Sequence, residues 1–234
     1  MRVLLAVLLV GIAGCGGGDN SPGDVAVPTP KSSQAKTDKS PAQNANADPV
    51  AALETIGAKI KRNDQGEVVE VSLRLSRKIT VGGQTTHLHQ PTKITDAGLV
   101  YLKGLTNLQN LNLAVPQITD AGLVHLKELT NLQTLNLSAT QVTDAGLVHL
   151  KGLDKLQALD LAFTKITDSG LVHLKGLVKL QTLDLMVCTQ ITDAGLVHLK
   201  GLARLQELNL RLTKITDSGV TDLKKSLPNC KISK

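Results

Sequence analysis

Four histidines recur at a near-constant interval along the chain, the pattern that a ladder of metal ligands would produce. Tyr101 precedes them in phase, and the four are His125, His149, His173 and His198. Each occupies the same place in its own predicted helix, so we expect neighbours about 10 Å apart, one helix diameter. A zinc ion holds imidazole nitrogens at about 2.1 Å. The spacing therefore predicts a solvated flank of successive helices and no shared metal.

His87 and His89 form a second candidate pair, two residues apart in a segment of strand-like alternation. Alternation would place both on one exposed sheet face, with Arg74 expected as the lateral neighbour of His89. Two histidines lack the third ligand and the supporting hydrogen bonds that a stable metal site needs. We expect no metal and no cofactor, and a metal-dependent or enzymatic role is only a remote alternative.

Two aspartates, Asp160 and Asp184, hold the same strand position in consecutive units and are expected about 5 Å apart. Paired carboxylates can perform acid-base chemistry, but no nucleophile or phosphate-binding loop accompanies them. A partner's basic side chain, or solvent alone, is the preferred interpretation, and the chain is predicted not to be an enzyme. A second aspartate column is explained by the helix starts that it marks; its members are Asp96, Asp120, Asp144, Asp168, Asp193 and Asp217.

These residues are positioned by a repeat whose anchors are Ile94, Ile118, Val142, Ile166, Ile191 and Ile215, separated by 24, 24, 24, 25 and 24 residues. Such a period is typical of a solenoid of stacked units. In the unit 142–165, Thr143 is expected to cap a short helix that ends near Lys151 and Gly152. The alternation in 156–161 predicts a short strand.

The pattern Leu-x-x-Leu-x-Leu-x-x-Thr-x-Ile, with its Thr-Asp-Ala-Gly-Leu opening, resembles the leucine-rich repeat family, in particular its ribonuclease-inhibitor-like and cysteine-containing subtypes. The resemblance runs from about Leu73 to the C-terminus. It implies an α/β solenoid, a horseshoe arc with a parallel sheet on the concave side and short helices on the convex side. Where the family carries Asn or Cys, this chain is aligned with Pro116, Thr140, Thr164, Thr189 and Thr213, and the rung at Pro116 is expected to be looser.

Four regions are predicted from the order of these patterns. Residues 1–15 resemble a lipoprotein signal peptide that ends in a bacterial lipobox at Cys15, with an ordinary secretory signal as the alternative. Residues 16–47 have the composition of a disordered tether. Residues 48–79 are expected to form an N-terminal cap of a helix and a hairpin. Residues 80–234 are the repeat array, with truncated first and last units, the first of them between Ile79 and Ile94.

The rest of the composition narrows the class of partner that the chain could bind. The formal net charge is +6, but the lysines are dispersed at about one per repeat, and Tyr101 and Phe163 are the only aromatic residues. Nucleic acid is therefore not expected, since its binding favours clustered cations and aromatic stacking platforms. With Cys15 assigned to a lipid, Cys188 and Cys230 are expected too far apart to pair and are predicted to be free thiols.

The family uses its concave sheet to bind proteins, so the resemblance implies a non-catalytic interaction module. A lipid at Cys15 would place it on a membrane of a bacterial cell envelope, or it would be secreted and soluble; a passive structural component of the envelope is the alternative function. The partner and the oligomeric state are left open. The predicted concave binding face consists of His87, His89, Asn112, Asn136, Asp160, Phe163, Asp184, Met186, Asn209 and Arg211.

Overall fold

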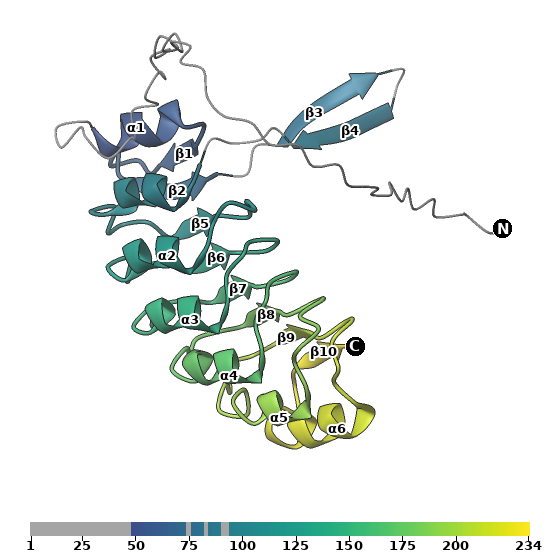
Figure 1. Cartoon of the computed structure of the whole chain (residues 1–234). Coiled ribbons are helices and arrows are strands. Elements are labelled where there is room, and N and C mark those ends of the chain that lie inside the picture. Colours follow the sequence, from purple (N-terminus) through teal and green to yellow (C-terminus); the bar gives the residue numbers. More distant parts are fainter. Residues whose placement is uncertain (1–47, 74–75, 82–83, 90–93) are drawn as a thin grey trace, which may run out of the picture. The chain divides into compact units, whose positions relative to one another are not determined.

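The computed structural model describes residues 48–73, 76–81, 84–89 and 94–234. The predicted signal peptide with Cys15, and the predicted tether over residues 16–47, lie outside this part of the chain. Strands line one side of the repeat array and short helices line the other (Figure 1).

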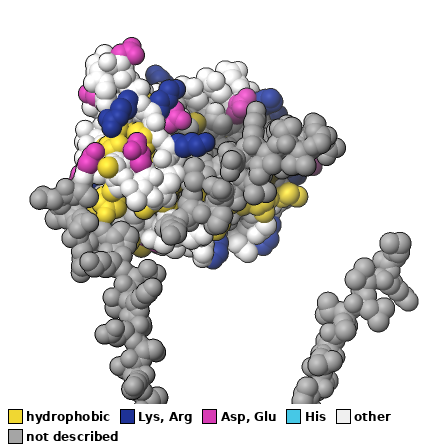
Figure 2. All heavy atoms as spheres, turned by 90° about the horizontal axis from the view of Figure 1, so that it is seen from above, with side chains coloured by type: hydrophobic (Ala, Val, Ile, Leu, Met, Phe, Trp, Pro, Cys, Tyr) yellow, Lys and Arg dark blue, Asp and Glu magenta, His cyan; other side chains and the backbone are white. Residues whose placement is uncertain are grey.

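The first described elements are a helix and a hairpin, both predicted from the sequence. Helix α1 spans Pro49–Thr55, and the side chain of Asp48 accepts a hydrogen bond of 3.0 Å from the amide of Val50. Strands β1 (Lys59–Arg62) and β2 (Val68–Ser72) pair antiparallel. Basic and acidic side chains are interspersed on the described part of this end of the array (Figure 2).

An eight-stranded sheet runs through the array in the order β1-β2-β5-β6-β7-β8-β9-β10. From β2 onward every pair is parallel, and residues one repeat apart are direct lateral partners, such as Asp160 and Asp184. Because the repeat length is nearly constant, equivalent residues of successive repeats form columns across the sheet. The strands are β5 (Asn110–Asn112), β6 (Thr134–Asn136), β7 (Ala158–Asp160), β8 (Thr182–Asp184), β9 (Glu207–Asn209) and β10 (Lys231–Ser233).

The helices are shorter than the predicted nine-residue segments. In a typical repeat one α-helical turn continues into a 3-10 turn, whose tighter winding suits a short connector. The last helix, α6, is the longest of the described helices, and Lys225 lies in it where other repeats have the Gly that follows the helix. The elements are η2 (Asp96–Leu102), α2 (Asp120–Leu123), η3 (Val124–Leu126), α3 (Asp144–Leu147), η4 (Val148–Leu150), α4 (Asp168–Leu171), η5 (Val172–Leu174), α5 (Asp193–Leu196) and α6 (Asp217–Ser226).

The core is a continuous stack of aliphatic layers between the sheet and the helices. In the third helix-strand unit, six leucines are all at most 1% exposed: Leu147, Leu150, Leu153, Leu156, Leu159 and Leu161. Each repeat packs against the next, so no layer is closed until a terminal unit covers it. This packing confirms the predicted inward positions.

The Thr-Asp-x-Gly motif joins neighbouring repeats, a role that the sequence did not indicate. Asp120 accepts hydrogen bonds from the amide (2.8 Å) and hydroxyl (2.6 Å) of Thr143 in the next repeat, and Thr143 in turn accepts one from Ala145 at its own helix start. A Cβ on Gly146 would collide with Asp120 Oδ1. Five members of the aspartate column, from Asp96 to Asp193, bond to the following repeat in this way, so the prediction that each Asp merely favours its own helix is incomplete.

The prediction of a truncated repeat between Ile79 and Ile94 is wrong. Strands β3 (Ser76–Val81) and β4 (Gln84–His89) pair antiparallel in a separate two-stranded sheet. Strand β2 pairs directly with β5, and Leu73 donates to the carbonyl of Asn112, so no place remains between them for another parallel strand. The Gly82-Gly83 pair in the sequence between two six-residue strands is a hairpin signal that was overlooked.

Candidate functional site

His87 and His89 do not belong to the candidate face, contrary to the prediction. Both lie in β4, where their Cα partners are Lys78 and Ser76 of β3. Ser76, and not Arg74, is thus the lateral partner of His89. In the eight-stranded sheet, Ser72 of β2 is instead aligned with Asn112 of β5.

The central column of the exposed sheet face consists of amide and carboxylate side chains that are partly buried. Each accepts a hydrogen bond from the backbone amide two residues later in the same repeat, which closes the end of its strand. The bonds measure 3.1, 2.8, 2.9, 2.8 and 3.2 Å for Asn112, Asn136, Asp160, Asp184 and Asn209. The column therefore has a structural role in addition to any contact with a partner.

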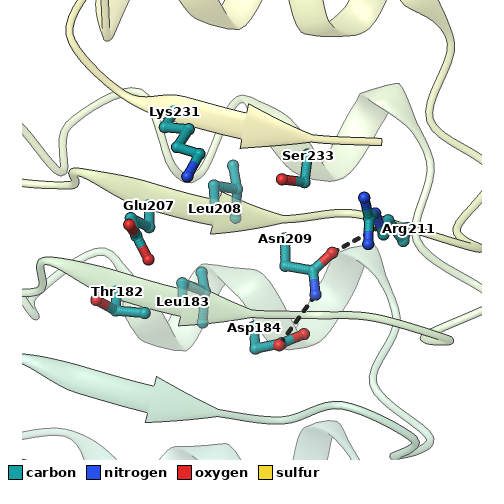
Figure 3. Close-up of a pocket in the computed structure, with 9 residues that line it drawn as sticks. All are labelled: Thr182, Leu183, Asp184, Glu207, Leu208, Asn209, Arg211, Lys231 and Ser233. Carbon is teal, nitrogen blue, oxygen red and sulfur yellow. Dashed lines mark hydrogen bonds between the residues drawn. The ribbon is translucent and has the colours of Figure 1, made fainter.

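A shallow hollow of about 230 Å³ lies over strands β8, β9 and β10 (Figure 3). Asp184, Asn209 and Arg211 of the predicted face line it, and Asn209 donates a hydrogen bond of 3.0 Å to Asp184 Oδ2. Glu207 and Lys231 line it too, although the prediction omitted them. Alternation could have found Glu207, since it lies two residues before Asn209 on the same face.

The described charged side chains around this hollow form no close ion pair with one another. Glu207 and Lys231 are direct lateral partners, yet among the described residues no ion pair within 4.0 Å involves Asp184, Glu207, Arg211 or Lys231. Two carboxylates and two cations therefore border one concavity in which a partner of matching charge could bind. A second hollow, of about 370 Å³ over β2, β5 and β6, is lined mainly by uncharged residues such as Asn112 and Asn136.

Apolar side chains border the same face where the strands end. Phe163 is 53% exposed and Leu212 is 72% exposed, with Val187 between them in the corresponding place. Their backbones, and that of Ala139, have φ values of 56 to 62°, the left-handed region that non-glycine residues seldom adopt. Inter-repeat bonds hold this geometry, for example from the Phe163 amide to the Met186 carbonyl at 2.9 Å.

The buried column behind this edge differs from the predicted one in two places. Thr140 and Thr164 are buried as expected, but the next position is taken by Cys188, and Thr189 is exposed because the 25-residue repeat places its extra residue there. Cys188 Sγ donates to the Leu161 carbonyl at 3.2 Å. In the first of these repeats Val115 takes the buried position and Pro116 is exposed. Pro116 therefore leaves no gap in the core.

Both described cysteines, Cys188 and Cys230, are free and buried, which confirms the prediction of unpaired thiols. Burial raises the pKa of each thiol above its usual value. Burial therefore disfavours the thiolate, the reactive form, at both positions.

The histidine column is less solvated than predicted. The four rings are half-buried, and the Nδ1 atoms of His125, His149, His173 and His198 are enclosed without a hydrogen-bond partner. Burial lowers the pKa of His125, and Lys103 of the preceding repeat lowers it further, against a smaller opposite effect of Asp96. Among the described residues, no three His, Cys, Asp or Glu side chains are grouped as metal ligands.

Comparison with known proteins agrees with this architecture. A leucine rich repeat profile matches residues 130–189, and a second leucine rich repeat profile matches residues 204–224. The chain therefore contains leucine-rich repeats, and its parallel sheet with short helices is a leucine-rich repeat solenoid.

Two internalins of Listeria monocytogenes are among the similar solved structures. Internalin C2 is 25% identical, with 82% of each chain covered and a TM-score of 0.48. The internalin inlF is 20% identical, with 80% of this chain and 53% of its own covered and a TM-score of 0.46. No curated protein matches the chain.

Proposed function

We propose that the chain is a non-catalytic binding module that holds a protein partner on the exposed face of its eight-stranded sheet. Leucine-rich repeats are typically modules for protein-protein interaction, and this supports the general assignment. The observation that carries the proposal is the hollow over β8 to β10, bordered by Asp184, Glu207, Arg211 and Lys231 without ion pairs among them.

The arrangement of charges suggests what the partner presents. Asp160 and Asp184 are lateral neighbours, so together they favour a lysine or arginine side chain of the partner. Arg211 lies two residues beyond Asn209 and favours an acidic group. Phe163 and Leu212 supply exposed apolar area beside these charges, and a buried aromatic or arginine commonly dominates the energy of an interface.

A triple variant tests the face without disturbing the strand ends. Asp160→Asn and Asp184→Asn preserve the Oδ1 acceptors, because Asn112 and Asn136 make the same bond in equivalent places. Arg211→Ser copies Ser138 of an equivalent position. A control variant with the same net change of charge alters the loops between helix and strand: Lys127→Ser, Glu128→Gln and Asp154→Asn.

The readout is photo-crosslinking from Ala158, which lies on the face, compared with crosslinking from Ala145 on the helix side. We expect one protein to be captured from Ala158 alone, and its capture to be lost in the triple variant but retained in the control variant. Equal capture by the triple variant would refute binding at this face. Absence of any specific product from Ala158 would favour the passive structural role.

We further propose export and lipid attachment at Cys15, supported by the lipobox-like sequence before it. In the part of the chain that the structure covers, no helix combines the length and apolarity needed to cross a membrane. A linker with the length of residues 16–47 would hold the array about 30 Å from the lipid on average. Metabolic labelling with a fatty-acid precursor should mark the wild type and not Cys15→Ser, whereas labelling of both would contradict attachment at this residue.

A further inference from the structure

The loops that lead from each helix to the next strand lie side by side along one edge of the array. Consecutive loops are joined at the strand starts, where the amides of Gln157, Gln181 and Gln206 donate to the preceding Gln carbonyls at 2.7, 2.7 and 2.8 Å. Lateral spacing at the sheet is about 4.8 Å. Lysines that are 24 residues apart in the sequence are therefore neighbours in space. We call the loops over residues 151–157, 175–181 and 200–206 the basic edge.

The basic edge carries six basic residues and one acidic residue, Asp154. Within the described chain only one of the six forms an ion pair, Lys200 with Asp222 at 2.6 Å. Lys155 Nζ donates to the neutral Asn131 Oδ1 at 2.6 Å, so its charge is not cancelled. The six are Lys151, Lys155, Lys175, Lys179, Lys200 and Arg204.

Comparison among the repeats shows that this positive charge is concentrated in the later repeats. One loop position is Asn107 and Asn131 in the earlier repeats but Lys155, Lys179 and Arg204 in the later three. Asn107 and Asn131 bond to the preceding loop or hairpin, at 2.8 Å to Glu67 and 2.7 Å to the Thr106 carbonyl. The side chains of Lys155, Lys179 and Arg204 are exposed, and Lys155 keeps its charge although it also bonds to Asn131, so positive charge is concentrated on the last three loops.

An exposed apolar residue lies between the cations in two of the loops. Val178 is 54% exposed between Lys175 and Lys179, and Ala203 is exposed between Lys200 and Arg204. A soluble polyanion would gain little from these apolar side chains. A lipid headgroup layer accommodates them, because small apolar groups enter the interface while flexible basic side chains reach the phosphates.

We propose that the basic edge binds the surface of an anionic lipid bilayer. The cations attract acidic headgroups, and Val178 enters the headgroup region between them. The sheet face is a different surface of the array, so this contact does not use the residues proposed to bind a protein. A tether anchored at Cys15 would raise the effective concentration of the edge at a membrane, but the contact does not require that anchor.

The test uses the full chain with Cys15→Ser, so that no attached lipid contributes to binding. Sedimentation with phosphatidylcholine vesicles is compared in the presence and absence of phosphatidylglycerol. The edge variant combines Lys155→Asn, Lys179→Asn and Arg204→Asn, which reproduce Asn107 and Asn131. The control variant removes equal charge on other surfaces through Lys59→Gln, Lys165→Gln and Lys214→Gln; the last two match Gln141 and Gln190 in their column.

Each basic residue near an anionic surface contributes about fivefold to membrane binding, so the edge variant should lose about two orders of magnitude in partition coefficient. The control variant should retain most binding, and on phosphatidylcholine alone the edge variant and the control variant should not differ. Equal loss in both variants would overturn the proposal, because only net charge would then matter. Binding to heparin with no binding to acidic vesicles would also overturn it, in favour of a soluble polyanion. Matching circular dichroism spectra would show that the variants are folded.

Discussion

Replacement of Gly146 by alanine tests the hydrogen-bonded contact between repeats. A Cβ at this position would meet Asp120 Oδ1 and lie 3.0 Å from Leu123 Cδ1. Asp120 cannot move away without weakening its bonds of 2.8 and 2.6 Å to Thr143. Alanine should therefore destabilise the array even though it favours helix formation.

The expected magnitude follows from these opposing effects. A hydrogen bond to a charged group contributes about 1.5–3 kcal/mol, and water compensates part of that at a half-buried site. Alanine is favoured over glycine in a helix by about 1 kcal/mol, which offsets part of this loss. The net loss for Gly146→Ala should therefore be about 0.5–2 kcal/mol in the free energy of unfolding.

Urea denaturation followed by circular dichroism measures this loss. Gly176→Ala is the matched control, because an added Cβ there meets nothing within 4 Å, and its stability should be unchanged within about 0.5 kcal/mol. In an Asp120→Ala background the collision with the carboxylate is absent and only the 3.0 Å approach to Leu123 Cδ1 remains, so Gly146→Ala should cost much less. An equal cost of Gly146→Ala with and without the Asp120 carboxylate would refute the reasoning.

Two further predictions concern the half-buried histidines and a buried thiol. Burial lowers the pKa of His125 and His149, so the unfolded chain takes up protons first as pH falls through about 6.5, and stability should decrease from about pH 7.5 to 5.5. The double variant His125→Gln and His149→Gln should show a smaller decrease in its urea midpoint, and an unchanged pH dependence would contradict this assignment. Cys188→Thr should change stability by less than about 1.5 kcal/mol, because Thr140 and Thr164 occupy equivalent places. Alkylation of the wild-type thiol by iodoacetamide should occur only on unfolding, so rapid modification of the native protein would count against its burial.

The repeat architecture was predictable because its signal is local and occurs many times. Leu147, Leu150 and Leu159 recur in phase, and each pattern matches the period of one helix or strand. Stacking then follows, since a single unit cannot bury its apolar face alone. The hairpin β3–β4 was not predicted, because the segment between Ile79 and Ile94 was interpreted as a truncated repeat although its Gly-Gly pair is a turn signal.

The candidate site was predictable only in part. Alternation correctly placed Asp160, Asp184 and Asn209 on one sheet face, because parallel register carries equivalent positions into one column. Alternation also suggested that His87 and His89 lie on this face. That prediction was wrong, because strand pairing between distant segments decides which strands share a sheet. The same alternation could have placed Glu207 on this face. Lys231 was harder to place, because it belongs to a terminal strand whose register is set by its partner strand.

Periodicity alone was sufficient to specify the solenoid, the leucine layers and the helix caps, since these depend on residues close together in the sequence. The tertiary structure decided which distant side chains meet. It directed Asp120 to the next repeat, placed Cys188 where Thr189 was expected, and gathered dispersed lysines into one basic edge. The physical reason is that stacking converts a separation of 24 residues into a lateral distance of about 5 Å near the sheet, so contact there depends on register between repeats.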